Sequence, residues 1–196
     1  MKKLSCILIF IGVLHNAFGQ HYIEKSVEAT SKNIEIYLND IDNLILKTTK
    51  TNRLSVKLDD FQNSFSNIKI YNENDKLIVR ATELILPQEQ FNKFCAEQPL
   101  LASYVIVVPI NSNVSLKINN GNLSIRRFEG DLKVEIETGE VILNTILGNV
   151  SLFIVDGSVQ AKLQSAQINV RTNLGKIVSN LPIKDVKQTA NTLRGI

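Results

Sequence analysis

The amino-acid sequence predicts an all-β protein, specifically a single-stranded β-solenoid with 18-residue coils and two short strands per coil. Glycines recur every nine residues in the C-terminal half, apolar and polar residues alternate between them, and the similarity is strongest at a separation of 18. A fixed short period is typical of repeat architectures, in which each unit stacks on the next. The glycines on this grid are Gly121, Gly130, Gly139, Gly148, Gly157 and Gly175, with only the slot at Ala166 missed.

Each nine-residue half of a coil has the pattern of one strand with a buried face, as in NVSLKINNG, NLSIRRFEG and DLKVEIETG. Alternation with period two is the signature of such a strand, and a closing glycine suits a corner that needs a positive φ. The predicted inward positions of the first halves are Val114, Leu132, Val150 and Ile168, then Leu116, Val134, Leu152 and Val170. Those of the second halves are Leu123, Val141, Val159 and Ile177, then Ile125, Leu143, Ala161 and Ser179.

An antiparallel meander is the alternative architecture. Asn120-Gly121 and Asp156-Gly157 are good hairpin turns, and every glycine corner would then reverse the chain. The solenoid is preferred because stacked coils require similarity at 18 residues, with equivalent side chains about 4.8 Å apart.

The N-terminal residues have the features of a secretory signal peptide over 1–19. Lys2 and Lys3 form the positive region, Leu4 to Leu14 form a short apolar run, and Ala17-Phe18-Gly19 supplies small residues before a cleavage point. We therefore expect an exported protein that is periplasmic, associated with the outer membrane or at the cell surface. Removing both lysines leaves 20 basic against 19 acidic residues, which gives no electrostatic case for nucleic acid or an anionic membrane. No second apolar run approaches transmembrane length, so we expect no transmembrane segment in the mature chain.

The mature chain divides into an irregular β-rich part (20–110), regular solenoid repeats (111–183) and a polar cap or tail (184–196). A short helix or loop is expected near 88–98, between Pro87 and Pro99, and a fuller strand at Tyr104 to Val108. The other N-terminal strands are expected at 34–38, 44–46, 54–58, 68–70 and 77–79, joined by turns such as Asn39-Asp40 and Asn72-Glu73-Asn74-Asp75.

Several of these elements resemble the bacterial putative adhesin family of β-strand repeat proteins, sometimes called toastrack domains. They are the strand that ends at Pro109, Asn120-Gly121-Asn122, Glu129-Gly130-Asp131-Leu132 and Thr138-Gly139-Glu140-Val141. The resemblance covers most of the mature chain and is strongest from Tyr104 to Leu181. It implies an exported or envelope-associated β-solenoid with a role in adhesion, and it brings no catalytic residues.

Residues for catalysis or metal binding are few. His21 and Cys95 are the only histidine and cysteine beyond residue 19, which leaves little basis for nucleophilic catalysis or zinc. Asn113, Asp131 and Asn149 share one slot of the repeat, and we interpret them as a hydrogen-bonded polar ladder rather than a calcium site. We expect no cofactor and no catalytic site.

Candidate contact residues lie on the outward positions. Glu135 and Glu137 point to the same side of one strand, so a polysaccharide-active hydrolase or lyase is one hypothesis, although Lys133 and Arg171 could neutralise both acids. Arg126 and Arg127 form a small basic patch beside Phe128, and Phe153 is predicted to point outward.

The sequence thus favours a non-enzymatic, exported binding or adhesion-like module of the cell envelope. The alternatives are a periplasmic structural or sensory module that contacts another envelope protein, and a polysaccharide-active enzyme. The expected partner is an envelope protein or a surface glycan, and end-to-end stacking of coils would allow oligomers.

Overall fold

The computed structural model describes residues 22–59, 66–83, 101–162, 166–172, 187–189 and 192–195. Over these residues the regular elements are all strands, and together they form one ten-stranded sheet, so the predicted all-β class is confirmed. The strands are β1 (Tyr22–Glu28), β2 (Asn33–Thr49), β3 (Arg53–Asp59), β4 (Ser66–Glu73), β5 (Lys76–Glu83), β6 (Ala102–Pro109), β7 (Ser112–Ala161), β8 (Ala166–Thr172), β9 (Lys187–Thr189) and β10 (Thr192–Gly195).

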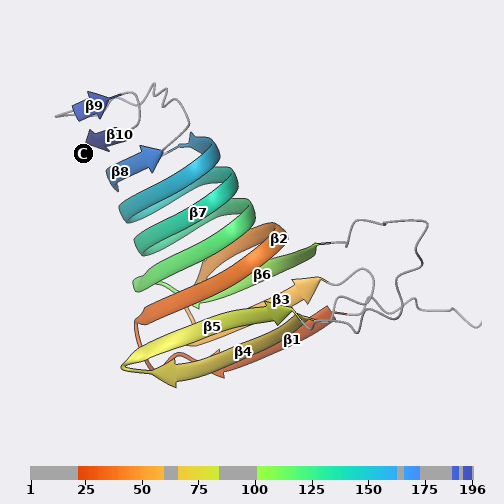
Figure 1. Cartoon of the computed structure of the whole chain (residues 1–196). Coiled ribbons are helices and arrows are strands. Elements are labelled where there is room, and N and C mark those ends of the chain that lie inside the picture. The colour runs from red at the N-terminus through yellow and green to blue at the C-terminus, as the bar shows by residue number, and fades with distance from the viewer. Residues whose placement is uncertain are drawn as a thin grey trace, which may run out of the picture.

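Most of the repeat half is a single strand that winds several times. β7 runs through 50 residues without interruption, and Figure 1 shows it as successive stacked ribbons between β2 and β8. The expectation of two separate short strands per coil is therefore wrong for the corners. There the strand changes direction without interruption, and the corner glycines have positive φ values between 137° and 155°, which residues with a side chain rarely adopt.

The strands on both sides of β7 pair with it in parallel. Val150 of β7 pairs with Ile168 of β8, and Leu152 pairs with Val170, both at a separation of 18 residues. β2 also pairs in parallel with β7, with Ile34 opposite Val114. Antiparallel pairing occurs at the two ends, between β1 and β3, β3 and β6, β4 and β5, β8 and β10, and β9 and β10. The antiparallel meander is thus wrong for the β2–β7–β8 region.

The corner glycines are required by close backbone contact as well as by φ. A Cβ atom built on Gly139 would lie well inside 3.0 Å of the carbonyl oxygen of Gly121, 18 residues earlier, and Gly157 stands in the same relation to Gly139. Gly148 and Gly130 repeat this contact at the other corner. The glycines therefore form two columns in which only a residue without a side chain fits.

The hydrophobic core fills the space inside the wound strand. The predicted inward positions in the first halves of the coils are at most 3% exposed from Val114 to Leu152, and Ile118, Ile136 and Ile154 are buried in the same way. Phe128 and Ile146 add a third buried position to the second halves. The prediction that Val159 points inward is wrong, because this residue is 39% exposed. Within the described residues, β8 pairs with residues 148–154 of β7 and not with residues 158–161. The second half of the last coil of β7, which contains Val159, therefore has no described strand stacked on it.

The wound strand presents two outer faces. The first face contains β4, β5, residues 33–40 of β2, and residues 113–120, 131–138 and 149–156 of β7. The second face contains β1, β3, β6, residues 43–49 of β2, and residues 122–128, 140–146 and 158–161 of β7. Thus β2 makes one full circuit, flanked on one side by β5 and β6 and on the other by β7.

The N-terminal half follows the predicted strands with two differences. Asn39-Asp40 does not join two strands, because β2 continues past it with a register shift between Asp40 and Asn43. β1 was not predicted. The turn between β4 and β5 lies where it was predicted, with Asn74 and Asp75 at positive φ. The predicted signal peptide (1–19), His21, Cys95, the 88–98 segment and Gly175 lie outside the described residues.

Candidate functional site

A shallow depression on the first face is the candidate site. It has a volume of ≈ 230 Å³ and lies where β5, β2 and two turns of β7 run side by side. Ser115 pairs with Glu35, and its short side chain leaves space between the longer Glu35 and Lys133. The residues that line it are Asn33, Ile34, Glu35, Lys76, Asn113, Val114, Ser115, Asp131 and Lys133.

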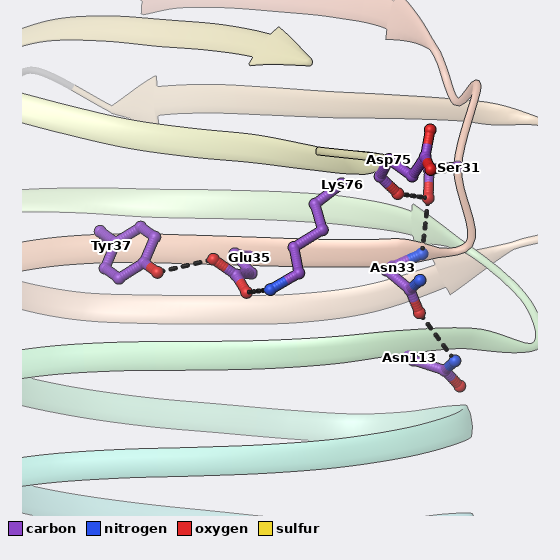
Figure 2. Close-up of polar contacts among 7 residues, drawn as sticks. All are labelled: Ser31, Asn33, Glu35, Tyr37, Asp75, Lys76 and Asn113. Carbon is purple, nitrogen blue, oxygen red and sulfur yellow. Dashed lines mark hydrogen bonds and ion pairs between the residues drawn. The ribbon is translucent and has the colours of Figure 1, made fainter. Parts of the chain in front are cut away.

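Glu35 is held at one edge of the depression by two donors, as Figure 2 shows. Lys76 Nζ lies 2.6 Å from Oε1, and the Tyr37 hydroxyl donates to Oε2 at 2.6 Å. The hydrogen bond from Lys76, followed by that from Tyr37, lowers the pKa of Glu35, whereas the same carboxylate raises the pKa of Tyr37. The Arg80 guanidinium lies 4.9 Å above the Tyr37 ring, so this cluster is a fixed, ionised part of the surface.

A ladder of polar side chains crosses the depression along the first position of each coil. Asn113 Nδ2 donates to Asn33 Oδ1 at 2.9 Å, and the backbone N–H of Asn33 donates to Ser31 Oγ at 3.1 Å (Figure 2). One coil further, Asn149 Nδ2 donates to Asp131 Oδ1 at 2.8 Å. The hydrogen-bonded interpretation of the slot shared by Asn113, Asp131 and Asn149 is confirmed for Asp131 and Asn149. Among the described residues no group of three or more histidine, cysteine or acidic side chains is placed to hold a metal ion.

The two predicted carboxylates have different surroundings. Glu135 Oε1 lies 2.7 Å from Lys133 Nζ, and Glu135 Oε2 lies 3.6 Å from Lys117 Nζ. The hydrogen bond from Lys133 contributes most to a lowered pKa of Glu135, the opposite direction from that needed by a general acid. Glu137 is exposed on the same strand. Lys133 was one of the two predicted neutralising partners. The other, Arg171, lies opposite Phe153 on β8, two coils from Glu135, and Lys117 was not foreseen.

The other predicted contact residues lie apart from the depression. Arg126 and Arg127 are exposed on the second face, and Arg127 Nη2 lies 2.7 Å from Glu129 Oε1. Phe128 beside them is fully buried. Phe153 lies on the first face between the buried Leu152 and Ile154 and is half-buried rather than fully outward.

Sequence reasoning missed the Glu35–Lys76 pair. The two residues are 41 positions apart and become neighbours only because β2 and β5 pair in parallel with Ile34 opposite Leu77. Neither lies in the regular repeat, so no periodicity pointed to them.

Acid should destabilise the protein partly through Glu35. Because its pKa is lowered from 4.5 in the folded state, its contribution is present above that value and is lost as the pH falls below it. Lys76 is 47% exposed, so the contribution should be below about 1 kcal/mol. Urea melts at pH 6 and pH 3 should show that Glu35→Gln loses less stability on acidification than the wild type. Glu137→Gln is the control, and equal acid sensitivity of all three proteins would contradict the assignment.

Comparison with known proteins gives neither a matching family model nor a curated relative. Among solved structures, the chain is similar to a putative cell adhesion protein from Clostridium sporogenes, with a TM-score of 0.49, 10% identity, and coverage of 89% of this chain and 87% of that one. A putative adhesin from Parabacteroides distasonis gives a TM-score of 0.36, 11% identity, and coverage of 74% and 66%. A putative lipid binding protein from the same species gives a TM-score of 0.27 and 11% identity, with coverage of 73% of this chain and 74% of that one. Proteins named as putative adhesins are therefore among the solved structures to which the chain is similar.

No helix that is long and apolar enough to cross a bilayer occurs in the described part of the chain.

Proposed function

We propose that the protein is a non-enzymatic, exported binding module of the cell envelope, adhesion-like in role, whose β2–β7–β8 region is a β-solenoid of 18-residue coils. The observation that carries the proposal is the depression on the first face. Its polar groups are supported by parallel strands rather than by loops, which keeps them in fixed positions.

The depression suits a neutral polar ligand. Its lining contains two lysines and two carboxylates, Glu35 and Asp131, so it carries no net charge. The amides of Asn33 and Asn113 and the hydroxyl of Ser115 add donors and acceptors. Hydroxyl-rich sugars match such a surface, so the ligand class that we favour is a surface glycan.

Blocking the depression should abolish this binding. Ser115→Trp places a large ring where the shortest lining side chain lies, so binding on an array of neutral oligosaccharides should fall at least about tenfold. The matched control is Ser124→Trp, which changes the equivalent outward serine of the same coil on the second face. The proposal would be wrong if the wild type bound no glycan, or if Ser124→Trp lost binding and Ser115→Trp kept it.

Export and location need a separate experiment. Cell fractionation combined with protease shaving of intact cells should find the chain outside the cytoplasm, trimmed near Gln20 and accessible to protease. A chain in the cytosol that keeps residues 1–19 would contradict export, whereas an exported chain fully protected from protease would rule out surface adhesion.

A periplasmic module that contacts another envelope protein is the second candidate. In the described part of the chain, β1 and β4 each pair on one side only. An unpaired strand edge can accept a strand from a partner. Cross-linking in intact cells, followed by isolation of this chain, should then recover one defined envelope protein.

A further inference from the structure

The second face carries a surface patch unlike anything on the first face. Outward positions of three neighbouring strands meet there, because Ile45 pairs with both Val105 and Ser124, and Lys47 pairs with Val107. Arg126 follows Ser124 by two residues and points to the same side. We call this set the basic–apolar patch, and its members are Ile45, Lys47, Val105, Val107, Ser124 and Arg126.

The centre of the patch is apolar although it faces outward. In β6 the inward residues Tyr104, Ile106 and Val108 are at most 3% exposed, while Val105 and Val107 between them are only half-buried. Ile45 lies beside Val105 and is half-buried in the same way. A strand with one solvated face usually has polar residues at such positions. Three adjacent β-branched side chains here indicate a surface that loses water when a partner covers it.

Basic side chains lie nearest to the patch, and the acids of this face lie further out. Asp42 accepts a hydrogen bond from Ser103 Oγ at 3.0 Å, and Glu24 lies opposite Lys57 of β3. Lys47 and Arg126 are exposed, and so is Lys162, which lies two coils after Arg126. Within the described residues no carboxylate pairs with Lys47, Arg126 or Lys162, whereas on the first face Lys76, Lys117 and Lys133 each contact a glutamate. In the described part of the chain, basic side chains without a carboxylate partner therefore lie beside this apolar area; Lys69 and Arg80 on the first face also lack such a partner.

We propose that the basic–apolar patch docks on a bilayer surface that contains anionic lipids. Lysine and arginine side chains at the rim contact lipid phosphates, and the central valines and isoleucine enter the boundary between headgroups and acyl chains. A soluble polyanion would use the charges and leave the apolar centre without a role. The docked second face leaves the depression on the first face pointing away from the bilayer and open to a ligand.

Vesicle co-sedimentation tests this proposal with the purified protein. Vesicles of phosphatidylglycerol and phosphatidylcholine should sediment the protein at low salt, and vesicles of phosphatidylcholine alone should not. Lys47→Gln/Arg126→Gln should weaken the binding about 25-fold, since each basic residue near such a surface contributes about fivefold. Val105→Thr/Val107→Thr keeps two strand-forming side chains and should weaken the binding several-fold at salt concentrations that screen the charges.

The matched control is Lys117→Gln/Lys133→Gln, which removes the same net charge from the first face and should change the binding less than about twofold. Thermal melts of each variant check that it remains folded. The proposal is overturned if the wild type fails to sediment with anionic vesicles, if it binds phosphatidylcholine equally well, or if the first-face variant loses as much binding as the second-face variant.

Discussion

Replacing Val150 with aspartate should remove most of the stability of the protein. Val150 is 3% exposed and lies on β7, where its strand neighbour on β8 is Ile168. The substitution loses about 2 kcal/mol of apolar burial and places a carboxylate among aliphatic side chains with no described partner. A cost of about 5 kcal/mol is expected, comparable to the total stability of many domains. Thermal unfolding followed by circular dichroism should show a melting temperature lower by tens of degrees or no cooperative transition.

The control for this experiment is Lys133→Ala on the outer side of the same coils. Lys133 is 59% exposed and its ion pair with Glu135 is solvated, so the loss should stay below about 1 kcal/mol. Similar melting temperatures for the two variants would show that the assignment of inward and outward positions is wrong.

Gly139→Ala should be nearly as damaging, although it adds a single methyl group. The backbone at Gly139 has a φ of 155°, and an added Cβ would overlap the carbonyl oxygen and carbon of Gly121. These atoms belong to the backbone, so no side chain can rotate away. Strain at positive φ and overpacking each cost about 1–3 kcal/mol, which predicts a total of about 4 kcal/mol in a urea melt.

The adjacent Thr138 provides the control. It is exposed at the same corner, so Thr138→Ala should change the free energy of unfolding by no more than about 0.5 kcal/mol. If Gly139→Ala were equally mild, the columns of glycines could not be as closely stacked as the structure indicates.

The repeat half could be predicted from the sequence because its buried positions recur. Alternation within each half identified Val114, Leu132 and Val150 as inward, and all three are buried. Alternation did not reveal that the strand continues through the corners. A glycine indicates a positive φ, but it does not indicate whether the backbone hydrogen bonds between neighbouring strands are interrupted there. Val159 follows the same pattern and was misassigned, since burial at the end of a stack depends on the next strand.

Elements outside the repeat were harder to predict. β1 has the sequence YIEKSVE, and Ile23 in it is 42% exposed. Val27 packs against the core but is only partly buried, so this strand shows too weak a hydrophobic period to have been predicted. The contacts that form the depression join Glu35 to Lys76 and Asn33 to Asn113, which are 41 and 80 residues apart. Only the pairing of β2 with β5 and β7 brings them together.

Disulfide trapping between Ser115→Cys and Lys133→Cys in a Cys95→Ser background tests the central claim most directly. Residues 18 apart on neighbouring parallel strands should lie about 5 Å apart, within the range that a disulfide spans. Mild oxidation should cross-link this pair rapidly and leave Ser115→Cys/Arg127→Cys, which a hairpin centred on Gly121 would bring together, unlinked. Cross-linking of the second pair and not of the first would contradict the stacking of coils on which the account depends.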